Sequence, residues 1–158
     1  IIGDVEYDAI FNTLNEMTKN KFYKKYNIEE KDTVIILAVP QLAEHFILSW
    51  EEHWKEIEFI LSEIARLDYK ILLSLHPKSD YNNYQYLESK FDCQILEEEL
   101  KSVLSCADIF IAANSSTVFW SVMLGVKTVI LNLDISIFNS LSSIVYVNEK
   151  NKLSSEVY

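Results

Sequence analysis

Short apolar runs alternate along this chain with longer stretches in which apolar residues recur at helical spacing. Four of the runs are rich in β-branched and aliphatic residues and predict strands buried on both faces, at residues 33–39, 70–75, 108–112 and 128–133. Two shorter runs, at 94–96 and 144–147, predict further strands. The chain therefore carries the strands of a sheet that is covered on both sides.

Apolar residues at three- and four-residue steps predict helices between these strands. The predicted helices cover residues 8–26, 42–66, 84–91, 98–105 and 117–124. Within 42–66, Ser49 followed by Glu52 fits a capping box, so two helices or one bent helix both agree with the pattern. Gly125 stands where a helix C-cap is expected.

Strands that alternate with helices at this spacing predict right-handed βαβ units. We therefore expect an α/β fold with a doubly wound, mostly parallel sheet. The length of 158 residues fits a single domain with its own hydrophobic core.

Polar clusters follow four of the predicted strands. Because parallel strands share one direction, the clusters should meet at the carboxyl edge of the sheet, where open α/β sheets bind ligands. They are Pro40-Gln41, His76-Pro77-Lys78, Asn114-Ser115-Ser116-Thr117 and Asn132-Leu133-Asp134.

The cluster from Asn114 to Thr117 is the strongest candidate for a phosphate site. Hydroxyl side chains at a helix start, together with unpaired N–H groups of the first turn, suit an anion, although plain helix capping explains one such residue. His76 could donate to a phosphate oxygen or act as an acid or base, and the alternative is a histidine in a surface turn. Glu44 and Asp134 are the acidic residues that could reach the same edge.

The remaining charged and aromatic residues have simpler interpretations. His45 and His53 are expected to be solvated side chains of an acidic helix, and their spacing fits no zinc motif. Acidic residues 97–99 are expected at a helix start on a solvated face, and the three tryptophans are expected in packing contacts.

Composition narrows the function classes. The net charge is −10 and the chain has a single arginine, Arg66, which argues against a nucleic-acid partner. Cys93 and Cys106 are expected to be reduced thiols of a cytoplasmic protein, and the sequence has neither a signal peptide nor an apolar run long enough to span a membrane.

At these motifs the chain resembles the C-terminal, nucleotide-sugar-binding half of GT-B-type proteins. It is similar in outline to UDP-N-acetylglucosamine 2-epimerases, glycerophosphotransferases of wall polymer synthesis and bacterial sialyltransferases with His-Pro and Ser-Ser/Thr motifs. Two stretches carry the resemblance: Ile2-Gly3-Asp4 with Tyr7-Asp8, and ADIFIAANSSTVFWSVMLGVKTVIL.

The resemblance implies a Rossmann-like half of a GT-B fold, with residues 1–8 as an interdomain crossover and 9–158 as the donor-binding domain. The N-terminal partner domain would lie outside this chain. The resemblance also implies a UDP-, CDP- or CMP-activated sugar as substrate and no cofactor. The implied binding residues are Gln41, His76, Lys78, Asn114, Ser115, Ser116, Thr117 and Ser121, the last standing where relatives place a carboxylate for the ribose.

Three functions follow from this resemblance. The first is the donor-binding domain of a glycosyltransferase in surface polysaccharide or glycoconjugate synthesis, which as an isolated domain should bind its donor without turning it over. The second is a nucleotide-sugar 2-epimerase or hydrolase, which needs further carboxylates such as Glu44 and Asp134. The third is a non-catalytic binding or assembly module of the same fold.

Overall fold

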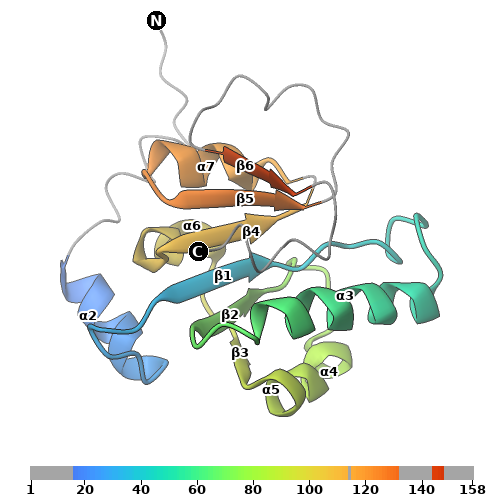
Figure 1. Cartoon of the computed structure of the whole chain (residues 1–158), viewed down its shortest axis with the longest axis horizontal. Coiled ribbons are helices and arrows are strands. Elements are labelled where there is room, and N and C mark those ends of the chain that lie inside the picture. The colour runs from blue at the N-terminus through green and yellow to red at the C-terminus, as the bar shows by residue number, and fades with distance from the viewer. Residues whose placement is uncertain (1–15, 114, 132–143, 148–158) are drawn as a thin grey trace, which may run out of the picture.

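The computed structural model describes residues 16–113, 115–131 and 144–147. The elements along the chain are α2 (Glu16–Lys25), β1 (Val34–Ala38), α3 (Trp50–Ile64), β2 (Lys70–Ser74), α4 (Tyr81–Tyr84), α5 (Tyr86–Phe91), β3 (Cys93–Ile95), α6 (Leu100–Val103), the 3-10 helix η1 (Leu104–Cys106), β4 (Ile109–Ala112), α7 (Thr117–Met123), β5 (Lys127–Leu131) and β6 (Ile144–Val147). Figure 1 shows the strands side by side with their arrowheads pointing the same way.

The sheet has six strands in the order β3-β2-β1-β4-β5-β6, and every neighbouring pair is parallel. This is the strand order of a dinucleotide-binding Rossmann fold. The predicted α/β class and the parallel pairing of the four main strands are both confirmed. The order reverses between β1 and β4, where Ile35 pairs with Ile109, so the switch point of the fold lies there.

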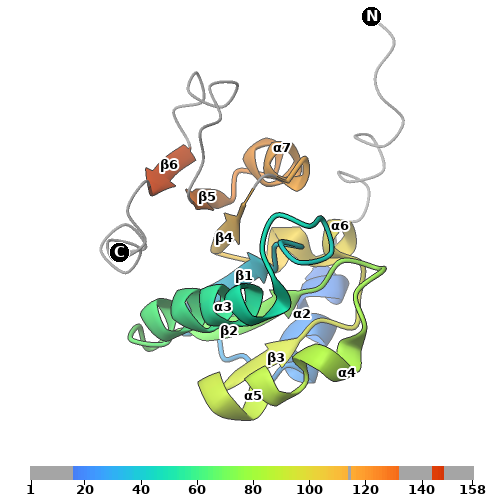
Figure 2. The ribbon, with the colours of Figure 1, turned by 90° about the vertical axis from the view of Figure 1, so that its right-hand side faces the viewer.

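Helices cover both faces of the sheet, as Figure 2 shows with α3 and α5 on one side and α2, α6 and α7 on the other. Alternate strand residues face the two layers. Ile35 and Leu37 of β1 belong to the core under α3, whereas Val34 and Ile36 belong to the core on the opposite side. The sheet is therefore buried on both faces, which is why its strands are continuous apolar runs.

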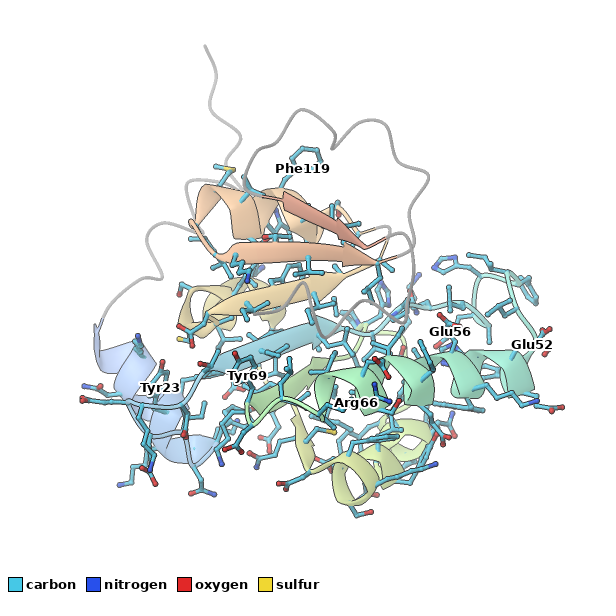
Figure 3. The ribbon with its side chains drawn as sticks, in the orientation of Figure 1. Tyr23, Glu52, Glu56, Arg66, Tyr69 and Phe119 are labelled. Atoms are coloured by element: carbon cyan, nitrogen blue, oxygen red, sulfur yellow. The ribbon has the colours of Figure 1, made fainter. Side chains whose placement is uncertain are left out.

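The region between β1 and β2 contains one long helix. The chain passes through turns at residues 42–46 before α3 begins at Trp50. The Ser49 hydroxyl accepts a hydrogen bond from the N–H of Glu52, and the Glu52 carboxylate accepts one from the N–H of Ser49. These two bonds form the predicted capping box at the start of α3, where Figure 3 labels Glu52. Residues 42–66 thus hold a loop and one helix.

Several boundaries differ from the sequence prediction. The helix predicted at 84–91 is two short helices that begin earlier, at Tyr81, because Asp80 caps Asn82 with its carboxylate. In place of the single helix predicted at 98–105, the structure has α6 followed directly by the 3-10 helix η1. Residues 1–15 and 132–143 lie outside the described residues. The crossover predicted at residues 1–8 therefore stays a prediction.

Candidate functional site

An open cleft of about 880 Å³ lies at the carboxyl edge of the sheet. Four strands deliver its walls, and two of these, β1 and β4, flank the switch point where doubly wound sheets bind ligands. Its lining includes Gln41, His45, His76, Ser79, Tyr81, the acidic segment 97–99, Ser115, Ser116, Thr117 and Trp120. Polar residues that are far apart in the sequence are thus brought to one cleft.

The hydroxyls at the start of α7 form one side of the cleft. Ser115 Oγ and Thr117 Oγ1 lie 2.7 Å apart, and the Ser115 hydroxyl also accepts a bond from the Thr117 N–H at 3.3 Å. Ser116 is exposed, and its hydroxyl makes no capping bond. The Ser116 hydroxyl can therefore turn toward a ligand without breaking a bond that holds the helix.

The backbone of this turn differs from the sequence expectation. The N–H groups of Val118 and Phe119 donate to the carbonyls of Ser115 and Ser116 at 3.2 and 3.1 Å, and the Thr117 N–H donates to Ser115. These N–H groups are satisfied within the turn, so the expected array of unpaired donors is not formed by them. The chemistry that this turn offers a ligand is mainly that of its hydroxyls.

His76 lines the same cleft as these hydroxyls and is exposed at the end of β2. Its Nδ1 accepts the N–H of Lys78 at 3.1 Å. A ring nitrogen that accepts an N–H carries no proton, so the neutral ring holds its hydrogen on Nε2. Nε2 is then a donor available for a negatively charged oxygen.

Gln41 and His45 follow β1 and also line the cleft. His45 Nε2 lies 3.2 Å from Gln41 Oε1, so the two side chains support one another across one turn of the loop. Lys78, by contrast, is an exposed residue whose side chain is not part of the described cleft lining. Its contribution to the site is the backbone bond to His76.

Two predicted residues lie elsewhere. Ser121 is fully buried, donates to the Val118 carbonyl at 2.8 Å and lies 2.8 Å from the hydroxyl of Thr128. It ties α7 to β5 and cannot reach a ligand in the cleft, which corrects its assignment to the binding set. Asn114 and Asp134 lie outside the described residues.

Glu44 is close to the cleft but directs its carboxylate into the protein. Glu44 Oε1 accepts the hydroxyls of Tyr84 at 2.9 Å and Ser79 at 3.3 Å. Glu44 is absent from the described lining residues, so the structure does not support the acid or base role that its sequence position suggested.

Acidic residues 97–99 line the cleft at the end of β3, and their arrangement was missed from the sequence. Lys25 Nζ lies 3.0 Å from Glu97 and 2.6 Å from Glu98, and the Tyr26 hydroxyl donates to Glu98 Oε2 at 2.5 Å. Burial raises the pKa of Tyr26 to about 12, with the bond to Glu98 adding to the effect. Glu97 and Glu99 are exposed at the start of α6, as predicted, whereas Glu98 is partly buried and held by Lys25 and Tyr26.

His53 also differs from its expected place. It is fully buried on α3, with Nε2 3.1 Å from the Tyr84 hydroxyl, and burial lowers its pKa despite the nearby Glu44. His53 precedes Ile57 by four residues and so lies on the apolar face of the helix. This spacing is the feature of the sequence that could have predicted its burial.

Within the residues that the structure describes, no group of three or more His, Cys, Asp or Glu side chains is placed to hold a metal ion. Over the same residues, no helix is both long and apolar enough to cross a membrane. The described lining of the cleft offers hydroxyl, imidazole, amide, carboxylate and ammonium groups.

The sequence matches no protein family and no curated protein. Similar folds occur among solved structures. The UDP-GlcNAc 2-epimerase of Methanocaldococcus jannaschii, in complex with UDP-GlcNAc and UDP, superposes with a TM-score of 0.69 at 20% identity, covering 99% of this chain and 46% of that one.

Two further similar structures are those of a glycosyltransferase and a polymerase. A glycosyltransferase from Rickettsia africae ESF-5 has a TM-score of 0.68 at 14% identity and covers 94% of this chain and 43% of its own. The wall teichoic acid polymerase TagF, soaked with CDPG, has a TM-score of 0.63 at 18% identity and covers 99% and 39%. The chain thus spans less than half the length of these proteins, and its fold is the Rossmann-like fold of a GT-B-type domain.

Proposed function

We propose that this chain is the nucleotide-sugar-binding domain of a glycosyltransferase that acts in surface polysaccharide or glycoconjugate synthesis. The observation that carries the proposal is the meeting of His76 with Ser115, Ser116 and Thr117 in one cleft at the switch point of the sheet. The volume of about 880 Å³ is in the range of small-molecule sites.

The charges of the cleft favour one orientation of such a ligand. Lys25 pairs with Glu97 and Glu98, and Lys101 pairs with Glu99, so three carboxylates and two lysines leave the wall at residues 97–99 with an excess of negative charge that disfavours phosphate. The hydroxyls of the α7 turn and the Nε2 hydrogen of His76 can instead donate to phosphate. The diphosphate is therefore expected beside α7, and the carboxylates suit the hydroxyl or amino groups of the remaining ligand. The leaving diphosphate would be stabilised by hydrogen bonds from these side chains.

The similar structures support this proposal through their fold and through the ligands of two of them: the epimerase is in complex with UDP-GlcNAc and UDP, and TagF was soaked with CDPG. Because the chain covers less than half of each, we infer that a second domain completes the cleft and brings the acceptor. The present chain would bind the activated sugar, and the protein that contains both domains would transfer the sugar to the acceptor.

Titration with UDP, CDP and CMP, followed by calorimetry and amide NMR shifts, tests the proposal. We expect saturable binding with shifts around Ser115 and His76, and weaker binding of uridine or cytidine, because phosphate is the main anchor. Ser116→Ala should weaken UDP binding by roughly threefold to tenfold through the loss of one hydrogen bond to a charged acceptor. Ser89→Ala removes an exposed hydroxyl on α5 and is the control.

Two outcomes would reject the proposal. The absence of binding at millimolar nucleotide, or shifts confined to residues far from Ser115, would leave the non-catalytic assembly module as the better hypothesis. Consumption of an activated sugar without any acceptor would instead indicate epimerisation or hydrolysis.

A further inference from the structure

A buried chain of polar groups connects two walls of the cleft. Glu44 lies in the loop at residues 41–48, which supplies Gln41, His45 and Ile47 to the cleft. Its partners lie in the segment after β2: the Ser79 hydroxyl, 35 residues away in sequence, and the Tyr84 hydroxyl, 40 residues away. One carboxylate oxygen therefore joins both walls.

The far end of this chain is anchored in the core. Tyr84 is 1% exposed, and its ring packs edge-on against Trp54 at 4.9 Å and against His53 at 6.0 Å between centroids. The single hydroxyl hydrogen of Tyr84 goes to Glu44, so His53 Nε2 is the donor in its 3.1 Å contact with Tyr84. The direction of the hydrogen bonds is fixed from His53 through Tyr84 to Glu44.

Burial raises the pKa of Tyr84 above its usual value of 10.0, and the hydrogen bond to Glu44 adds to this effect. The phenol therefore stays protonated, and remains a donor, throughout the ordinary pH range.

The loop depends on this link because its own hydrogen bonds return to itself. The N–H groups of His45, Phe46, Ile47 and Leu48 donate to the carbonyls of Gln41, Ala43 and Leu42. These bonds shape the loop without attaching it to the opposite wall, whereas the Glu44 carboxylate does attach it.

The network is not optimised for stability alone. Glu44 Oε2 and His53 Nδ1 are buried and find no hydrogen-bond partner among the described residues. Unpaired buried polar atoms are uncommon in native proteins, and an apolar contact would hold two segments together without them. A carboxylate adds a defined distance and direction between the two segments.

We propose that Glu44 is a positioning residue of the cleft, which sets the separation between the loop carrying Gln41 and His45 and the segment carrying His76, Ser79 and Tyr81. The part of this inference that concerns ligand affinity rests on the proposed function. The part that concerns the loop does not, and the two are tested separately.

Hydrogen exchange of backbone amides tests the loop without any ligand. Glu44→Ala and Tyr84→Phe should exchange several-fold faster at residues 45–48 than the wild type, while the strands of the sheet keep their protection. Glu44→Gln retains an acceptor oxygen for Tyr84 and should restore most of the protection. Circular dichroism confirms that each variant is folded.

The chain supplies a matched control pair. The Tyr86 hydroxyl donates to Glu58 Oε1 at 3.1 Å, which is the same chemistry on the exposed side of α3 and α5, outside the described cleft lining. Glu58→Ala and Tyr86→Phe should leave exchange at 45–48 unchanged. Equal exchange in wild type, Glu44→Ala and Tyr84→Phe, or equal acceleration in the control pair, would overturn the assignment.

Titration of the same variants with UDP tests the effect on the site. Glu44→Ala and Tyr84→Phe should bind UDP roughly threefold to tenfold more weakly than wild type, with the double variant no weaker than either single one. Unchanged UDP affinity in variants with a loosened loop would overturn the positioning role. A wild type that binds no UDP but shows the expected exchange pattern would reject the proposed function and uphold the role of Glu44 in the cleft.

Discussion

The hydroxyl oxygens of Ser121 and Thr128 lie 2.8 Å apart in the core, and neither side chain is exposed. The Ser121 hydroxyl is placed to donate to the Val118 carbonyl or to Thr128, and the Thr128 hydroxyl is placed to donate to the Val126 carbonyl or to Ser121. Each hydroxyl has one hydrogen, so each donates one of these bonds at a time. The contact joins α7 to β5 in the core, and neither residue belongs to the described cleft lining.

Ser121→Ala should therefore destabilise the protein without changing the site. We expect a loss of about 1 kcal/mol in the free energy of unfolding, since one buried hydrogen-bonded hydroxyl is removed, and an unchanged UDP affinity. Urea denaturation and calorimetry measure the two quantities. Ser116→Ala is the complementary variant, with reduced affinity and unchanged stability, and a loss of UDP affinity in Ser121→Ala would contradict the buried placement.

Glu98 makes the stability depend on pH in the acid range. Burial raises the pKa of its carboxyl, but the hydrogen bonds from Lys25 and Tyr26 outweigh burial, so the net pKa lies below the usual 4.5. The unfolded state therefore takes up a proton first as the pH falls. The contribution of Glu98 is complete above about pH 4.5 and is lost as the pH falls through the folded-state pKa.

Glu98→Gln removes this contribution at every pH. The difference in unfolding free energy between wild type and Glu98→Gln should be largest near neutral pH and shrink below about pH 4.5, as measured by urea denaturation at a series of pH values. A difference that is independent of pH would show that the bonds from Lys25 and Tyr26 do not stabilise the ionised carboxylate.

His53 should titrate below its ordinary value of 6.5, because burial disfavours the charged ring more than Glu44 favours it. As the pH falls below 6.5 the unfolded chain binds a proton that the folded protein does not, so stability decreases. NMR titration of the ring gives the folded-state pKa. His53→Gln, which keeps a donor for Tyr84, should lack this part of the acid destabilisation, and a folded-state pKa at or above 6.5 would refute the prediction.

The two thiols should be unreactive in the folded protein. Cys93 and Cys106 are free and each is 4% exposed, and they belong to the cores on opposite faces of the sheet. Burial raises the pKa of Cys93 to about 12 and also raises that of Cys106. A disulfide exchange reagent near pH 8 should label neither thiol in the folded protein. After urea is added and the protein unfolds, the same reagent should label both thiols. Rapid labelling of one thiol in the folded state would contradict its burial.

The strands were predictable because burial on both faces leaves uninterrupted apolar runs such as β1 and β4. The start of α3 was predictable because the capping box at Ser49 and Glu52 is a local signal. The convergence of His76 and Ser115 on one edge followed from strand direction alone.

The remaining parts of the site depend on contacts between distant segments. Glu98 looks like an ordinary helix-start acid until α2 brings Lys25 and Tyr26 to it, more than 70 residues away in sequence. Glu44 similarly faces inward because Ser79 and Tyr84 are there to receive its carboxylate. No pattern within one element reveals such pairs.

The strand order also has a consequence for the route of folding. The segments β1, β2 and β3 pair in sequence order, but β1 meets β4 only across a separation like that of Val34 and Asp108, 74 residues. When only the first three strands have paired, Gln41 and His76 are in place at the edge of the sheet but Ser115, which follows β4, is not. Because this is the least local strand pairing of the sheet, we expect the cleft to form late. Mutations that slow the docking of β4 should then delay the site more than the first half of the fold.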